Sequence, residues 1–107
     1  MAKIVQITDG KIVFDTGDVI TYYHNQDCCE CNYADFEQLD DLALQAEFDT
    51  ECMEFEAVDG CGFRFGNGAN MFFVPCYSEQ NGYYATDLDI YYNNVRVLNL
   101  ECEERFN

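Results

Sequence analysis

Basic residues are scarce in this sequence. Its 107 residues include five Lys and Arg against 21 Asp and Glu, so the formal net charge is 5 − 21 = −16. Nucleic acid and anionic membrane surfaces repel such a chain, which argues against both as direct partners. Solubility of a small domain needs a net charge of only about 2–8 in magnitude. The excess therefore favours a basic partner, with ordinary solubility as the alternative.

Proline and long apolar runs are also rare. One Pro and seven Gly indicate no linker, and the length predicts a single domain over residues 1–107. No apolar stretch reaches the length of a transmembrane helix. The opening MAKIVQITDGK lacks the apolar run of a signal peptide. We therefore expect a cytoplasmic protein with reduced cysteines.

Strand patterns dominate what is present. Apolar and polar residues alternate in segments such as CMEFEAV and TDLDIYY, as in half-buried strands. Turn dipeptides separate these segments at 9–10, 17–18, 59–60, 67–68, 81–82 and 93–94. The pattern predicts an α+β fold, mainly an antiparallel sheet of about seven short strands with one short helix near 35–46. It leaves open whether the sheet curls into a partial barrel.

The predicted helix rests on a change of period. Phe36, Leu39 and Ala43 recur at helical spacing. Asp35 is a candidate N-cap, and Gln38 follows three residues later as its capping-box partner.

The segment 22–35, YYHNQDCCECNYAD, is the obvious candidate for chemistry. His24, Cys28 and Cys31 form an H-x3-C-x2-C pattern that zinc accepts, but a tetrahedral site usually draws on a second close ligand pair, which is missing. The competing interpretation is that the cysteines are small buried hydrophobes in a tight loop. We favour that interpretation and expect no metal or other cofactor.

A thiol enzyme is the other chemical hypothesis for this segment. Cys28 or Cys29 would act as nucleophile with His24 as base and Asp27 as orienting group. A reactive thiolate needs positive charge nearby, and the surrounding acids raise cysteine pKa values instead. We therefore expect no enzymatic activity, with His24 tying a strand end to the following loop.

Two blocks give the chain a resemblance to a family. The first comprises Tyr22, His24, Gln26, Asp27, Cys28, Cys29 and Glu30, and the second Asn81, Gly82, Tyr83 and Tyr84. Across roughly residues 6–95 the chain resembles small phage and bacterial proteins that are grouped as a domain of unknown function. The resemblance implies a phage or mobile-element setting and no particular reaction. Cys31 is not part of the family pattern.

The acidic segment provides the functional hypothesis. Between Lys11 and Arg64 no Lys or Arg occurs. The predicted partner-binding residues are Asp35, Glu37, Asp40, Asp41, Glu47, Asp49, Glu51, Glu54, Glu56 and Asp59. Carboxylates on a helix face and an adjoining strand can imitate the charge of nucleic acid. We expect an inhibitor of a basic nucleic-acid-binding enzyme such as a CRISPR effector, in the manner of an anti-CRISPR protein.

Aromatic side chains complete this expectation, and two alternatives remain beside it. Tyr33, Phe36, Tyr83 and Tyr84 are the predicted anchors of the contact. A structural or accessory phage protein is the first alternative, in which the acids form an ordinary solvated surface. The second is the metal- or thiol-dependent enzyme centred on residues 24–31.

Overall fold

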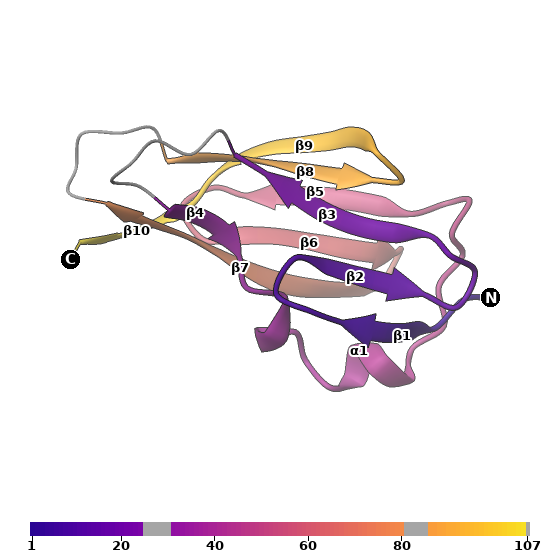
Figure 1. The fold of residues 1–107 in the computed structure, drawn as a ribbon. Helices are drawn as coiled ribbons and strands as arrows, with labels where there is room; N and C mark the ends of the chain where they lie inside the picture. Colours follow the sequence, from indigo (N-terminus) through magenta and orange to yellow (C-terminus); the bar gives the residue numbers. More distant parts are fainter. Residues whose placement is uncertain (25–30, 81–85, 107) are drawn as a thin grey trace.

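The structure, a computed structural model, describes residues 1–24, 31–80 and 86–106 and consists mostly of strands (Figure 1). Its strands are β1 (Ile4–Ile7), β2 (Lys11–Phe14), β3 (Val19–Tyr23), β4 (Cys31–Ala34), β5 (Glu54–Val58), β6 (Gly62–Asn67), β7 (Asn70–Gln80), β8 (Asp87–Tyr92), β9 (Val95–Glu101) and β10 (Glu103–Phe106). Between β4 and β5 lie a 3-10 turn, η1 (Phe36–Gln38), and a single helical turn, α1 (Leu42–Gln45).

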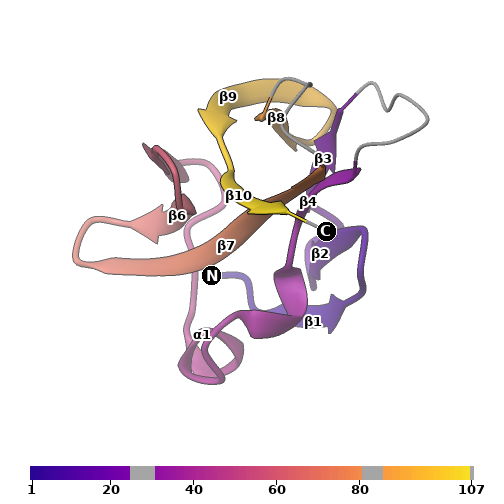
Figure 2. The same ribbon diagram turned by 90° about the vertical axis from the view of Figure 1, so that its left-hand side faces the viewer.

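The strands form two sheets that curl into a half-barrel, seen from its end in Figure 2. One sheet has the order β1-β2-β3-β8-β9, and the other has the order β10-β7-β6-β5, with β4 also paired to β7. Strand β5 packs beside β9, which brings the sheets together on one side. On the other side η1 packs against β7 and α1 against β1. The segment between β4 and β5 therefore fills the gap between the sheets.

The core lies between the sheets and is rich in phenylalanine. Its largest fully buried side chains are Phe14, Phe36, Phe48, Phe63, Phe65, Ile12, Ile20, Leu88, Ile90, Leu100 and Val74. They come from both sheets and from the segment between β4 and β5. Backbone hydrogen bonds of 2.8 Å in both directions between Ala2 and Phe48 fix the end of that segment to the N-terminus. The segment that closes the half-barrel thus also contributes side chains to the core.

Five of the six predicted turns join neighbouring antiparallel strands. Residues 9–10, 17–18, 59–60, 67–68 and 93–94 connect β1 to β2, β2 to β3, β5 to β6, β6 to β7 and β8 to β9. Asn93 and Asn94 have φ of 51° and 67°, the left-handed pair that a tight hairpin of matching twist needs. The turn predicted at 81–82 lies outside the described residues.

The helix predicted near 35–46 is wrong as a single element. The backbone of Leu39 is extended (φ −59°, ψ 136°) and separates η1 from α1. Asp40 accepts a 2.9 Å hydrogen bond from the Leu42 amide, a local turn that competes with a continuous helix. Asp35 precedes η1 without capping its amides and instead accepts a 2.7 Å hydrogen bond from the Gln38 side chain. The fold is therefore more β than the predicted α+β class.

The antiparallel sheet itself is confirmed, with more strands than expected. The C-terminal segment divides at the buried Cys102 into β9, which belongs to the sheet with β8, and β10, which belongs to the sheet with β7. Strand β10 pairs parallel to the C-terminal half of β7, which brings Glu103 beside Tyr77. The other strand pairs in the described residues are antiparallel.

Candidate functional site

The predicted partner-binding acids are mostly exposed, and they lie in three places. Asp35 and Asp49 are half-buried, and the other eight are exposed. The first place is the segment around η1 and α1, below the barrel in Figure 1, with Glu37, Asp40 and Asp41. Buried side chains hold this segment against the core, namely Phe36, Leu39 and Ala43.

The second place is the chain leading into β5. The side-chain amide nitrogen of Asn67, on β6, donates hydrogen bonds to the backbone oxygens of Asp49 and Cys52, at 3.1 and 3.0 Å. These bonds hold the chain against β6. The carboxylates of Asp49, Glu51 and Glu54 act on the exposed thiol of Cys52. They raise its pKa, chiefly because the thiol donates a hydrogen bond to Asp49. The structure thus concentrates negative charge at this end of the barrel.

Asp18 adds a carboxylate to the same end. Hydrogen bonds from Thr16 and Asn93 lower its pKa. Burial, with Asp18 nearby, raises the pKa of Tyr92 to about 12. The Tyr92 hydroxyl donates a 3.0 Å hydrogen bond to the backbone oxygen of Thr50. Sequence reasoning missed Asp18 because it lies 31 positions before Asp49 in the chain.

The third place is β5 and the turn after it. Glu56 forms an ion pair with Arg64 on β6, which neutralises its charge locally. Asp59 accepts a 3.4 Å hydrogen bond from the Glu101 amide. Strands β6 and β7 lie between this group and η1, so the ten acids do not form one continuous strip. Alternation along a strand gave the right faces, but it carries no information about the order of the strands.

A further acidic face, outside the predicted set, lies on β8 and β9. The Asn99 side-chain amide donates to Asp87 and Asp89, at 3.2 and 2.8 Å. The Arg96 guanidinium lies 3.8 Å from Asp89 and balances part of its charge. The alternation of Asp87 and Asp89 with buried Leu88 and Ile90 was the signal that placed them on an outer face.

The histidine and cysteine segment is only partly described. His24 follows β3, and its Nδ1 lies 3.9 Å from an oxygen of Asp87 on β8. Gln26, Asp27, Cys28, Cys29 and Glu30 lie outside the described residues. Cys31, expected to be buried, is exposed at the start of β4. Partial burial of the thiol of this exposed residue, together with the nearby Glu79, raises the pKa of Cys31, which disfavours the thiolate.

Clusters of metal ligands do not occur in the described ranges. Within residues 1–24, 31–80 and 86–106, no three His, Cys, Asp or Glu side chains converge on a common point. Burial raises the pKa of Cys76, and it raises that of Cys102 to about 12. These two thiols are therefore neutral at physiological pH and act as core side chains.

One predicted aromatic anchor is wrong. Phe36 is fully buried and stacks at 5.8 Å against Tyr22, because it fills the core below η1. Tyr33 is half-buried, and its hydroxyl donates a 3.1 Å hydrogen bond to Glu79. Tyr83 and Tyr84 lie outside the described residues. Helical spacing correctly placed Phe36 on an apolar face. That face packs against the core, so a partner cannot reach Phe36.

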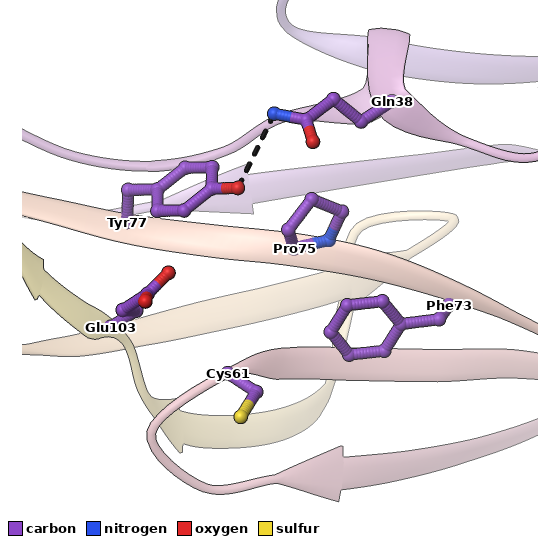
Figure 3. A pocket seen from close by; sticks show the side chains of 6 residues that line it. All are labelled: Gln38, Cys61, Phe73, Pro75, Tyr77 and Glu103. Atoms are coloured by element: carbon purple, nitrogen blue, oxygen red, sulfur yellow. Dashed lines mark hydrogen bonds between the residues drawn. The ribbon is translucent and has the colours of Figure 1, made fainter.

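Sequence reasoning missed a hollow on the outer face of β7. This pocket has a volume of about 350 Å³ and is lined by Gln38, Cys61, Phe73, Pro75, Tyr77 and Glu103 (Figure 3). Its residues come from four separate parts of the chain, so no local pattern in the sequence indicates it. The apolar run MFFVPCY was the only partial signal, since a strand that is apolar on both faces has an outward apolar face to cover.

Helices that could cross a membrane do not occur among the described residues. Comparisons of the chain with protein-family models, curated proteins and solved structures find no match. Its function is therefore inferred from its own charge, shape and pocket.

Proposed function

We propose that this protein is a small acidic binding protein that inhibits a basic nucleic-acid-binding enzyme by imitating the charge of nucleic acid. The observation that carries the proposal is the charge relative to the size of the body. The chain has a net charge of −16, and its Cα trace extends 43 × 23 × 19 Å. A duplex 43 Å long carries about 25 phosphate charges, at one per roughly 1.7 Å. The protein approaches that density on an elongated body.

The exposure of the carboxylates supports the same proposal. Eight of the ten predicted acids are exposed, so a partner can reach them without unfolding the chain. Asn67 holds the group around Cys52 on β6, which places these charges before a partner arrives. Charge that is already in place costs less conformational entropy on binding.

The three places of the acids suggest the shape of the target. A flat basic surface can contact acids on only one side of the barrel. A channel lined with Lys and Arg can surround the protein and contact acids on several sides. We therefore expect a target that encloses nucleic acid. CRISPR effectors are the first candidates, because the resemblance implies a phage setting and such host enzymes are the natural targets of a small acidic phage protein.

Displacement of nucleic acid tests the proposal. A fluorescently labelled duplex is bound to a panel of basic nucleic-acid-binding proteins, CRISPR effectors included, and its anisotropy is followed as this protein is added. We expect displacement at about 50 mM salt and at least roughly tenfold weaker displacement at about 200 mM, since charge contacts are screened. If no panel member releases its duplex or retains this protein even at low salt, the proposal fails.

Matched variants locate the contact. The triple variant Asp49→Asn, Glu51→Gln and Glu54→Gln has a net charge of −16 + 3 = −13. A control with the same charge carries Asp9→Asn, Asp15→Asn and Glu104→Gln, which lie outside the predicted set. We expect the first triple to weaken displacement about tenfold and the control to weaken it less than about threefold.

One observation favours the second candidate function, a structural or accessory phage protein. The predicted acids lie on several sides of the barrel, as in an ordinary solvated surface. Under this alternative the two triple variants behave alike, and no panel enzyme is inhibited at near-stoichiometric amounts of the protein.

A further inference from the structure

The floor of the pocket is the outer face of β7. Phe73, Pro75 and Tyr77 alternate with fully buried Val74 and Cys76 and so lie on the other face of β7, where the neighbours of Tyr77 leave it only 6% exposed. Phe73 is 39% exposed, which leaves its ring open to a ligand. The floor thus presents the open ring of Phe73, with Pro75 and the buried Tyr77 next to it along the strand.

A glycine lies where β6 passes close to the backbone of β7. Gly62 on β6 pairs with Pro75 on β7. A Cβ on Gly62 would lie 2.1 Å from the carbonyl oxygen of Val74, closer than any side chain tolerates. The close approach of β6 to β7 beside Pro75 therefore needs a residue without a side chain.

One wall of the pocket lies where β7 changes partner. The Cys76 amide donates a 2.9 Å hydrogen bond to the Cys61 backbone oxygen, at the end of the pairing with β6. Immediately beyond, Tyr77 pairs with Glu103 of the parallel strand β10. Paired residues of neighbouring strands point to the same face, so the Glu103 carboxylate stands beside the Tyr77 ring. Figure 3 shows Cys61 and Glu103 together on this side of β7.

The opposite wall is Gln38 of η1, and its orientation is fixed by its neighbours. The Asp35 carboxylate only accepts hydrogen bonds, so the Gln38 amide nitrogen must face it, at 2.7 Å. The same nitrogen lies 3.3 Å from the Tyr77 hydroxyl and donates its second hydrogen there. The Gln38 carbonyl oxygen is therefore left over, and in Figure 3 it points toward Pro75.

The strongest polar groups aimed at this hollow are thus acceptors, one of them charged. Glu103 supplies a carboxylate and Gln38 a carbonyl oxygen, and no Lys or Arg is among the six described residues that line the pocket. Aromatic faces attract cations through the ring quadrupole. We propose that the pocket binds an arginine side chain of the basic partner protein, an inference that rests on the proposed function.

Arginine fits these groups better than lysine or a neutral ligand. Its planar guanidinium stacks on aromatic rings, presents several donors at once and is less strongly hydrated than an ammonium ion. The volume of about 350 Å³ is near the lower end of the roughly 300–1,000 Å³ typical of ligand pockets. Such a space accommodates one long side chain together with water, and the net charge of −16 draws a cation to it.

The test uses isolated amino-acid probes and therefore needs no target protein. N-acetylarginine amide, N-acetyllysine amide and the neutral isostere N-acetylcitrulline amide are titrated into labelled protein. Binding is followed by the NMR signals of the Gln38 side-chain amide. We expect saturable shifts with the arginine probe, at least roughly threefold weaker binding of the lysine probe, and no saturation with the citrulline probe.

Two variants and one control distinguish binding in the pocket from the general attraction of a cation to this negatively charged protein. Glu103→Gln and Phe73→Ala should each weaken arginine binding, Glu103→Gln by about tenfold, because they remove the carboxylate or an aromatic face. Glu104→Gln removes the same charge from the next residue of β10, which points to the other face, and should change binding less than about twofold. Equal effects of Glu103→Gln and Glu104→Gln overturn the inference, as do equal affinities for the arginine and citrulline probes.

The two proposals fail in different ways. If arginine binding depends on Glu103 but no protein releases its nucleic acid, the arginine pocket is supported and the proposed function is overturned. If the Glu103→Gln variant displaces nucleic acid as strongly as the unmodified protein, the proposed function is supported and the pocket has no part in it.

Discussion

The inner face of β6 and β7 is closed, whereas their outer face is hollow. On the inner side Phe65 is fully buried and makes ring contacts with four other phenylalanines, at centroid distances of 5.7–6.5 Å. On the outer side Phe73 is 39% exposed beside a pocket. Both side chains are phenylalanines on paired strands, yet only the first is enclosed on all sides. The inner face therefore determines stability, which leaves the outer face free to bind.

The same substitution on the two faces tests this comparison most strongly. Phe65→Ala should lower the free energy of unfolding by about 3–5 kcal/mol, because it leaves a cavity among packed rings. Phe73→Ala should lower it by less than about 1 kcal/mol, since water already reaches that ring. Urea unfolding of both variants measures the difference. Equal losses would contradict the assignment of stability to the inner face.

The buried thiols on the inner side predict a loss of stability at alkaline pH. Burial raises the pKa of Cys76 and raises that of Cys102 from 9.0 to about 12. The folded state holds these protons more tightly than the unfolded state. Stability is therefore complete below pH 9 and falls as the pH rises from 9 to 12, on the order of a few kcal/mol at about 1.4 kcal/mol per pKa unit.

The matching variants sharpen this prediction. Urea midpoints are measured in reductant between about pH 8 and pH 11, across the range in which the thiols titrate. Cys102→Ala should reduce the slope of stability against pH, whereas Cys61→Ala should leave it unchanged, because Cys61 is exposed on the outer side. A slope that is identical in both variants would show that the core thiols do not govern alkaline unfolding.

Gly62 tests the packing of the two strands themselves, since its missing side chain admits the close approach of β7. Gly62→Ala should cost about 1–3 kcal/mol, because the new Cβ meets the Val74 backbone oxygen at 2.1 Å. Gly10→Ala is the control, since a Cβ at this position of the first hairpin turn meets nothing within 4 Å. Thermal unfolding of the two variants compares them, and a neutral Gly62→Ala would mean that β6 and β7 are not so closely packed.

The smallest effect is expected from the ion pair on the outer face. Arg64 and Glu56 are 44% and 56% exposed, so water and salt screen their attraction. Arg64→Met should change the free energy of unfolding by no more than about 0.5 kcal/mol. A loss above about 2 kcal/mol in urea unfolding would show that the outer face also carries the fold.

The sequence predicted those features that depend on neighbours along the chain. The alternation of Glu54 and Glu56 with Phe55 indicated the exposed and buried faces of β5, because side chains alternate across a strand. The dipeptide Asn93-Asn94 indicated its hairpin, because a tight turn needs positive φ and asparagine is one of the few residues that adopt it readily. The helix failed because propensity and spacing did not register the local turn made by the Asp40 side chain.

The candidate site was less predictable than the strands. Glu37 and Glu56 belong to one acidic stretch of the sequence, yet β6 and β7 separate them in the fold. Gln38 and Glu103 are 65 positions apart and face the same pocket. Nothing in a local pattern relates such pairs, since contact between them depends on the order of strands in the sheets.

The sequence by itself therefore determined the charge, the antiparallel strands and most of their turns, because these follow from residue types and short-range backbone preferences. Only the tertiary structure decided that the acids occupy three places, that Phe36 belongs to the core and that β10 runs beside β7. The physical reason is that burial and strand order are set by packing among distant residues, which compete for one interior.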